Sequence, residues 1–370
     1  MPHRAVSFIC KTLSAIIILG LILGSLAFGA FTYFNAPPEG NLELARSSIA
    51  EMTVRGESGI RLEDDGDLVL EVRNGESAQS VGNRLQSAGL IRNRYFWNLL
   101  FRLDGELIKT GTYRIELPSS QTGIRSILTG GEQLLVRVTI PEGFTLGRTS
   151  RLLEEAGICK ADDFLAAASS PEILAKYNIP GNTMEGYLYP DTYLFPLAYP
   201  TRMVVSAMAD NFFRRLDEID RELSVSISAM SPEEINERVI LASIVEREYR
   251  APDEAIVMAG VFSNRLRIRM ALQSCATVEY VITEILGRPH PTVLYNRDLE
   301  IRNPYNTYLN QGLPPGPISA PGRIALMAAF EPASTNYLFF RLVDVNTGRH
   351  YFSHTLDEHI RAGTLFVKGR

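Results

Sequence analysis

The chain has 370 residues, of which 45% are apolar, and a formal net charge of −5 at pH 7. This size and apolar content allow two or three folded domains with a sizeable core. The slightly acidic charge balance gives no electrostatic footprint for nucleic acid, so nucleic-acid binding is not expected.

The first long segment of the chain is apolar. Residues 12–34 contain no charged side chain, and at 1.5 Å per residue a helix of this length crosses a hydrocarbon core of roughly 30 Å. Arg4 and Lys11 precede the run, and Glu39 and Glu43 follow it. The positive-inside rule then predicts a cytoplasmic tail at 1–11, a transmembrane helix at 12–34 and the rest of the chain outside. A cleaved signal peptide is the alternative, although the apolar run is long for one.

Residues 35–66 are rich in proline, glycine and acidic side chains, which predicts a linker with little packed structure. The next segment, 67–137, reads as a small module. It has an alternating strand at 68–73, a helix capped by Ser77, a second short helix around Trp97 and a strand that starts at Gly111. The order strand, helix, helix, strand resembles the LysM fold, which often binds glycan. The alternative is a spacer that binds nothing.

A similar strand-turn-helix unit returns after the module. VRVTIPEGFT repeats the strand and turn, and Thr145 takes the capping place of Ser77. Leu153 and Ile158 then fall on Leu85 and Leu90. This correspondence predicts a short internal repeat at the start of the next domain, 138–370.

The stretch 184–196, MEGYLYPDTYLFP, alternates aromatic side chains around Pro190 and Asp191. We expect two short strands that meet at a bend. Such rings suit the face of a sugar, although ordinary β core also explains the alternation. Glu185 and Asp191 place two carboxylates in this stretch, and either could help to build a cleft.

The segment 231–273 contains the strongest catalytic candidates. Ser231 and Pro232 predict a helix start, and VILASIV over 239–245 predicts a helix buried on every side. Glu246 and Glu248 follow at once. Burial and the negative end of the helix dipole favour a protonated carboxyl, which suits a general acid. The alternative is a frayed helix end at which both glutamates form surface ion pairs. Spacing alone does not decide which of the two glutamates faces a cleft.

The C-terminal part adds a binding loop. Residues 303–322, NPYNTYLNQGLPPGPISAPG, combine prolines, amides and tyrosines, a composition that favours an ordered binding loop. We also expect a helix at 324–331 and a hairpin over 335–353 with its turn at 346–348. The spacing of His350, His354 and His359 matches no zinc motif, and phosphate, dinucleotide and serine-hydrolase motifs are absent, so no metal and no cofactor are predicted. Whether Cys159 and Cys275 pair stays open.

Several separated stretches together resemble the YceG-like family of endolytic murein transglycosylases, which are membrane-anchored enzymes that cut peptidoglycan. They are TIPEGFT, EGYLYPDTYLFP, ILASIVEREY, GVFSNRLRIRMALQS, TVEYVI, NPYNTYLNQGLPPGPISAPG and HYFSHTLDEH. The resemblance completes an α+β prediction. It comprises one N-terminal transmembrane helix, a small LysM-like α/β module and a mixed α/β catalytic domain at 138–370.

The resemblance also implies roles for single residues. The family's catalytic acid is the second glutamate of an I-[IV]-E-x-E stretch, which falls on Glu248. Loop position and family motif suggest the substrate-binding residues Gln273, Ser274, Asn264, Tyr305 and Asn306, with Glu185 and Asp191 added. The chain departs from the family at Tyr249, where a small residue is usual, and at Cys275-Ala276, which replaces Asp-Pro. Arg341-Leu342 also intervenes after LFF. These departures bear on substrate preference and activity.

The implied reaction is a non-hydrolytic cut of the β-1,4 bond after N-acetylmuramic acid that leaves a 1,6-anhydro end. The resemblance further implies a terminase of nascent strands in the cell inner membrane, with peptidoglycan synthases as partners. Two alternatives remain open. One is a hydrolytic muramidase that pairs Glu248 with Glu185, Asp191 or Glu246. The other is a non-catalytic scaffold that binds glycan strands.

Overall fold

The computed structural model describes residues 2–38, 45–49, 51, 59–62, 66–73, 75–131, 133–197 and 199–365, with side chains from residue 13 onward. The chain divides into two compact units. The first is Met1–Leu135 with Pro196–Ala198, and the second is Val136–Phe195 with Tyr199–Arg370.

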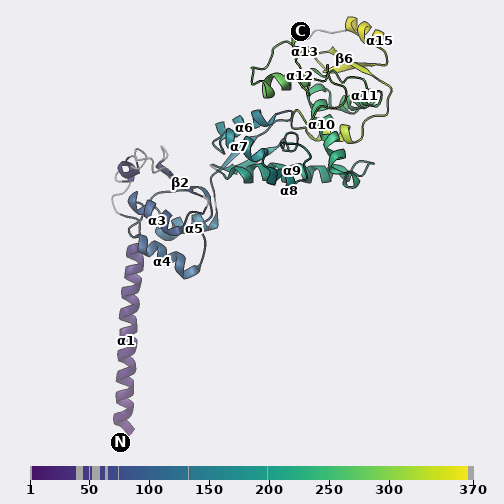
Figure 1. The fold of residues 1–370 in the computed structure, drawn as a ribbon. Coiled ribbons are helices and arrows are strands. Elements are labelled where there is room, and N and C mark those ends of the chain that lie inside the picture. Colours follow the sequence, from purple (N-terminus) through teal and green to yellow (C-terminus); the bar gives the residue numbers. More distant parts are fainter. Residues whose placement is uncertain are drawn as a thin grey trace. The chain divides into compact units, whose positions relative to one another are not determined.

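The first unit combines a long helix with a small antiparallel sheet of order β1-β2-β3. Its elements are α1 (Pro2–Asn35), β1 (Ile60–Leu62), β2 (Leu68–Val72), α3 (Ala78–Ser87), α4 (Arg94–Asp104), β3 (Gly111–Ile115) and α5 (Gln121–Gly130). Figure 1 shows α1 as one continuous helix, and its part Leu13–Asn35 is long and apolar enough to cross a membrane. Its last turn is bonded to α5, because Asn35 Oδ1 accepts the Thr122 N–H at 2.9 Å.

The predicted linker at 35–66 is partly folded, which corrects the sequence expectation. β1 pairs with β2, with Ile60 opposite Leu70. Ala45 and Ile49 are buried in the core of the unit. Apolar side chains spaced among the acids thus supply enough surface for packing. The rest of this predicted linker, at 39–44, 50, 52–58 and 63–65, lies outside the described residues.

The predicted order strand, helix, helix, strand is confirmed as β2, α3, α4 and β3. Ser77 caps α3 by accepting the Ser80 N–H at 3.2 Å. Trp97 is fully buried, and its indole N–H donates to the Ala78 carbonyl at 2.8 Å, which ties α4 to the start of α3. β1 and α5 are additions that the sequence pattern did not predict.

The second unit contains two small sheets, β4-β5 and β6-β7, and a set of packed helices. Its first elements are β4 (Leu135–Thr139), α6 (Leu146–Glu155), α7 (Ala161–Ala168), α8 (Pro171–Lys176), β5 (Thr192–Pro196), α9 (Thr201–Asp220) and η1 (Ile227–Ala229). Its later elements are α10 (Pro232–Glu248), η2 (Pro252–Glu254), α11 (Ala255–Arg267), α12 (Cys275–Tyr280), η3 (Val281–Ile285), α13 (Asn296–Leu299), α14 (Arg323–Phe330), β6 (Phe339–Asp344), β7 (Arg349–Ser353), α15 (Leu356–Arg361) and η4 (Ala362–Leu365).

The strand-turn-helix repeat is confirmed, but only one of the two strands predicted for the aromatic stretch forms. Thr145 caps α6 as Ser77 caps α3, by accepting the Arg148 N–H at 3.1 Å. The aromatic stretch forms only one strand, β5, which pairs with β4. The residues before it stay irregular, because Gly186 has φ +82° and Pro190 lacks an N–H for pairing. The rings of this stretch are buried, so they belong to the core: Tyr187, Tyr189, Tyr193 and Phe195.

The central helix α10 agrees closely with its prediction. Ser231 and Glu234 form a capping box at its start, and all seven residues from Val239 to Val245 are buried. The helix ends at Glu248, and it packs against α14, α11 and α12. The loop at 303–322 contains no helix or strand, and the C-terminal hairpin β6-β7 is antiparallel, as predicted. In Figure 1 this hairpin is yellow, with α15 beside it.

Candidate functional site

Glu248 is the last residue of α10, and one hydrogen bond fixes its carboxylate. The Ser274 hydroxyl donates to Oε1 of Glu248 at 2.5 Å. Burial raises the pKa of Glu248 to about 7, while the Ser274 hydrogen bond acts in the opposite direction. The nearby Glu279 raises this pKa further, and Arg247 lowers it. A carboxyl poised near neutral pH can both give and take a proton, as general acid–base catalysis requires.

Ser274 is held by the loop that follows α13. Its backbone N–H donates to Thr307 Oγ1 at 3.1 Å, and the Gln273 N–H donates to the Thr307 carbonyl at 3.1 Å. Thr277 Oγ1 lies 2.9 Å from Thr307 Oγ1. Gln273 has φ +50°, a left-handed conformation that these bonds stabilise. Thr307 therefore positions the Ser274 hydroxyl at Glu248, a role that the sequence reasoning missed although Thr307 lies within the NPYNTYLNQG stretch.

The proline-rich end of the same loop is attached to the middle of α10. The Ser243 hydroxyl accepts the Ile318 N–H at 3.0 Å and donates to the Ile240 carbonyl at 2.7 Å. The Ser319 hydroxyl donates to the Ser243 carbonyl at 3.0 Å. These hydrogen bonds in a buried helix attach the loop to α10 at Ile318 and Ser319, in addition to its attachment to Ser274 at Thr307.

Glu246 faces a different partner from Glu248. Its Oε2 accepts the Gly322 N–H at 2.9 Å at the start of α14, and its Oε1 accepts from the Tyr249 hydroxyl at 3.5 Å. Burial, followed by the charge of Glu142, raises the pKa of Glu246 to about 7. The two glutamates of the I-V-E-R-E stretch thus have separate environments, as expected for residues two apart on a helix.

The two carboxylates of the aromatic stretch have structural partners. Both oxygens of Glu185 accept the Leu146 N–H at 3.1 Å, at the start of α6, and the Tyr280 hydroxyl lies 3.5 Å away. Burial raises the pKa of Glu185 to about 8. Asp191 accepts from Asn211 at 3.1 Å and pairs with Arg215 at 3.3 Å.

Two predicted substrate ligands prove to be framework residues. Asn264 is buried, and its Nδ2 donates to the carbonyls of Thr335 and Tyr337. Asn306 is fully buried, and its Nδ2 donates to the carbonyls of Leu299 and Ile301. These placements correct the expectation that both amides line the cleft, because their donors already hold neighbouring backbone.

Gln273 and Tyr305 differ from these amides in their exposure. The Gln273 side chain is exposed beside Ser274. Tyr305 is half-buried and its ring lies 5.1 Å from that of Tyr280. Of the predicted binding residues, Gln273, Ser274 and Tyr305 therefore remain next to the site with accessible surface or a direct contact to Glu248.

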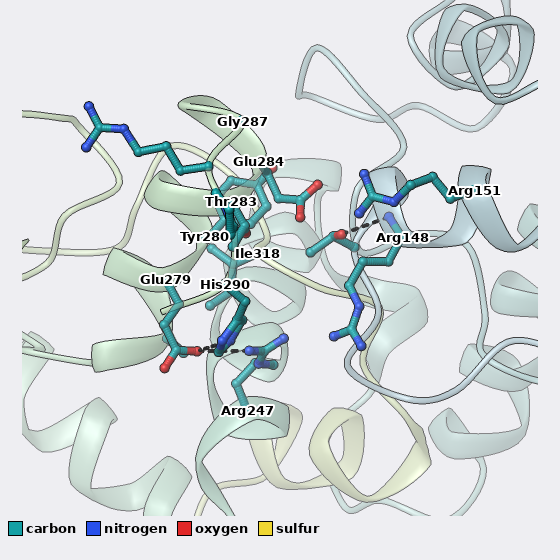
Figure 2. Close-up of a pocket in the computed structure, with 14 residues that line it drawn as sticks. Arg148, Arg151, Arg247, Glu279, Tyr280, Thr283, Glu284, Gly287, His290 and Ile318 are labelled. Atoms are coloured by element: carbon teal, nitrogen blue, oxygen red, sulfur yellow. Dashed lines mark hydrogen bonds and ion pairs between the residues drawn. The ribbon is translucent and has the colours of Figure 1, made fainter. Parts of the chain in front are cut away.

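A cavity of about 630 Å³ lies beside this end of α10. Glu248 does not line it, but Arg247 and Ala276, the close neighbours of Glu248 and Ser274 in the chain, do. Figure 2 shows Arg247 with Glu279 and His290 on one side, and Arg148 with Arg151 on the other. Arg247 pairs with Glu279 at 3.0 Å, and His290 Nε2 lies 3.4 Å from the same carboxylate. This cavity was not predicted from the sequence, although Arg148 and Arg151 are three residues apart on one helix.

Three of the positions that depart from the family pattern, Tyr249, Cys275 and Ala276, lie near the site. The Cys275 thiol is 3.2 Å from the Tyr308 hydroxyl, and Tyr249 contacts Glu246. Cys159 and Cys275 are both unpaired. Across the described ranges, no group of three or more His, Cys, Asp or Glu residues is arranged to hold a metal ion.

Comparison with known proteins identifies the family. The sequence profile of the YceG-like family matches residues 70–364. The chain belongs to the YceG-like family. A YceG-like protein from Listeria monocytogenes, known from a crystal structure, is similar with a TM-score of 0.53 and 29% identity. That match covers 80% of this chain and 98% of the Listeria chain.

Two curated relatives are named endolytic murein transglycosylase. The protein from Streptococcus pneumoniae (strain ATCC BAA-255 / R6) is 27% identical in an alignment of 319 positions that covers 78% of this YceG-like chain. The match covers only 56% of the pneumococcal protein's own length. The protein from Bacillus subtilis (strain 168) is 26% identical in an alignment of 324 positions that covers 81% of this chain and 85% of the relative.

Proposed function

We propose that this YceG-like chain is an endolytic peptidoglycan transglycosylase in which Glu248 is the catalytic acid and base. The observation that carries the proposal is the environment of Glu248. Burial places its pKa near 7, and the Ser274 hydroxyl holds one of its oxygens at 2.5 Å. The shared name of the curated relatives supports the same reaction class.

The chemistry needs only one carboxylate. Ordinary glycosidases use two, one as acid and one as base or nucleophile. Here the 6-hydroxyl of N-acetylmuramic acid attacks the anomeric carbon of its own sugar, so the nucleophile is already close. Glu248 gives its proton to the leaving 4-oxygen of the next sugar and takes the proton of the 6-hydroxyl. One C–O bond breaks and one forms, no water enters, and the product carries a 1,6-anhydro end.

The neighbouring residues then have distinct roles. Ser274 orients the Glu248 carboxylate and adjusts its pKa through the hydrogen bond. Gln273 and Tyr305 contact the glycan, since both lie beside Ser274 or its loop with accessible side-chain surface. Glu185 and Asp191 support the cleft without contacting the glycan, because their carboxylates are hydrogen-bonded to α6 and α9.

The apolar segment of α1 anchors the enzyme in the cell inner membrane, with the N-terminus in the cytoplasm and the second unit outside. At the membrane surface the enzyme meets nascent strands, and it cuts them as a terminase of elongation next to peptidoglycan synthases. The β2-α3-α4-β3 core of the first unit is a LysM-like module. We place this module at 67–137 and the catalytic domain at 138–370.

The test is a digest of purified peptidoglycan by the full chain in detergent, with products read by mass spectrometry. Glu248→Gln is the matched variant, because it keeps the shape of the side chain and removes the titrating group. We expect internal fragments with 1,6-anhydro ends from the wild type, and a loss of at least about a thousandfold in rate for the folded variant.

Two other outcomes contradict the proposal in different ways. Fragments heavier by one water would identify a hydrolytic muramidase with a second carboxylate, for which Glu246 is the nearest candidate in sequence. Binding of strands without any product from a folded wild type would instead identify a glycan-binding scaffold, and would direct attention to Tyr249, Cys275 and Ala276.

A further inference from the structure

The cavity beside Glu248 is lined by several arginines, and most of them form no ion pair with the acidic residues of the cavity. Arg148 and Arg151 reach it from α6, and Arg288 reaches it from the loop after η3. Within the part of the chain that the structure describes, none of these three arginines has an acidic oxygen at ion-pair distance. Arg247, on the opposite wall, is paired with Glu279. Figure 2 shows the side chains of Arg148 and Arg151 on the same side of the cavity, across from Arg247.

The position of Arg148 is fixed before any ligand arrives. Its guanidinium lies 4.2 Å above the ring of Phe144, a stacking contact that holds the planar group in place. Burial and the positive charges of Arg247 and Arg151 lower the pKa of Arg148, while the negative charge of Glu284 acts in the opposite direction. Like charges thus repel one another in the cavity, and an anionic ligand would relieve that repulsion.

The cavity is coupled to the proposed reaction centre through the chain itself. Arg247 directly precedes Glu248 on α10, and Ala276 is two residues after Ser274. On the proposed function, the sugar whose bond is cut at Glu248 is N-acetylmuramic acid. This sugar carries a peptide stem with free carboxylates.

We propose that this cavity binds the carboxylates of the peptide stem on the muramic acid next to the scissile bond, through Arg148 and Arg151. The inference rests on the proposed function and adds a determinant of substrate choice to it. Arginine forks match carboxylates in bidentate geometry, which gives direction as well as charge attraction.

The mixed charge of the walls favours a peptide over the pyrophosphate of a lipid-linked strand. Glu279 and Glu284 line the same cavity as the arginines. A pyrophosphate carries only negative charge, so both glutamates would repel it. A peptide stem combines carboxylates with an amino group on its diamino acid, and Glu284 is placed to meet that amine.

The experiment compares two substrates that differ only in the stem. Glycan strands with intact stems, and the same strands after an amidase has removed the stems, are digested by the full chain in detergent. We expect the wild type to have a kcat/KM at least about tenfold higher on stem-bearing strands, with the difference in KM. Charge-assisted hydrogen bonds to a carboxylate change affinity by about this factor. In the Arg148→Gln/Arg151→Gln double variant we expect this preference to fall below about threefold. Arg202→Gln, which changes an exposed arginine of α9 paired with Glu172, is the matched control and keeps the preference.

A binding measurement separates this inference from the proposed function. In the Glu248→Gln background, the affinity for the two kinds of strand is measured without turnover. If the wild type cuts nothing but this variant still binds stem-bearing strands about tenfold more tightly, the proposed function fails and the stem site stands. An equal affinity for both kinds of strand overturns the stem site. An equal loss of kcat/KM on both substrates in the double variant overturns it as well. So does inhibition by inorganic pyrophosphate that the double variant abolishes, if the wild type shows no stem preference.

Discussion

The Ser274 hydroxyl donates a 2.5 Å hydrogen bond to Glu248 Oε1 and thereby joins the C-terminal end of α10 to the residue before α12. Thr307 holds the backbone N–H of Ser274 from the loop at 303–322. The protonation of Glu248 thus depends on Ser274, which follows it by 26 residues in the chain. It also depends on the loop that carries Tyr305. Burial favours the neutral carboxyl and the serine favours the charged one.

Ser274→Ala is expected to shift the pH profile of cleavage to higher pH. The serine hydrogen bond stabilises the carboxylate, so its loss raises the pKa of Glu248 above the value of about 7. A hydrogen bond to a charged group contributes about 1.5–3 kcal/mol, and one pKa unit corresponds to about 1.4 kcal/mol, so a shift on the order of one pH unit follows. The alkaline limb of kcat/KM between pH 6 and 9 measures it.

Ser228→Ala is the control for this profile, because Ser228 is an exposed residue of η1. Its profile is expected to match that of the wild type. A Ser274→Ala variant with lower activity but an unshifted limb would show that the serine holds the loop without adjusting the carboxyl.

Glu248→Gln is expected to stabilise the fold at alkaline pH. The folded pKa of Glu248 is about 7 against an ordinary value of 4.5, so the folded state binds the extra proton between these values. Wild-type stability therefore falls as pH rises through this window and is lowest above pH 7. The glutamine variant lacks this loss. We expect it to be more stable than the wild type by about 1–3 kcal/mol at pH 8, with no advantage remaining near pH 4.

Calorimetric unfolding from pH 4 to 8 provides the measurement. Glu233→Gln changes an exposed carboxylate in the first turn of the same helix and serves as the comparison, with an expected effect below about 1 kcal/mol at every pH. A glutamine variant at 248 whose advantage is the same at pH 4 and pH 8 would mean that Glu248 does not hold its proton through burial.

Gly186→Ala is expected to disrupt the packing between the aromatic stretch and the binding loop. Gly186 has φ +82°, and an added Cβ would lie 2.5 Å from Pro317 Cβ and 3.1 Å from Val239 Cγ1. Both strain and overlap oppose the substitution, and we expect a loss of about 2–4 kcal/mol in the free energy of unfolding. Gly312→Ala separates the two causes, because Gly312 has φ +88° with nothing within 4 Å of the added carbon. It should cost only about 1 kcal/mol. Equal losses in denaturant titrations of the two variants would contradict the steric account.

Local signals in the sequence were sufficient for the central helix. The cap at Ser231, the uncharged run from Val239 to Val245 and the break after Glu248 each act over a few residues, and all three agree with the structure. The linker was misjudged because composition averages over a segment, whereas Ile60 needs only a partner strand to become ordered. The aromatic stretch was misjudged because alternation predicts buried rings equally well in a strand and in irregular core.

The site was less accessible to such reasoning, because it depends on contacts between distant segments. The family resemblance, and not periodicity, distinguished Glu248 from Glu246. Amides in a loop were expected to face a ligand, yet Asn306 holds backbone carbonyls of its own loop. Thr307 lies in a singled-out loop, and the two arginines of α6 are three residues apart, but their roles appear only when α6, α12 and the loop meet.

The final prediction concerns the C-terminal hairpin, which Glu254 attaches to the start of α11. Glu254 is buried, and it accepts the backbone N–H of His350 at 3.1 Å and faces His350 Nδ1 at 2.8 Å. Its neighbour Asp253 is exposed and pairs with Arg349 at the surface. Glu254→Ala leaves buried donors without an acceptor, so we expect a loss of about 2–4 kcal/mol and faster hydrogen exchange of the β6-β7 amides. Asp253→Ala should cost below about 1 kcal/mol, as exposed ion pairs do, and leave the exchange unchanged. Similar exchange in both variants would show that the hairpin is held by its apolar contacts, such as that of Phe340 with Phe262, and not by the buried carboxylate.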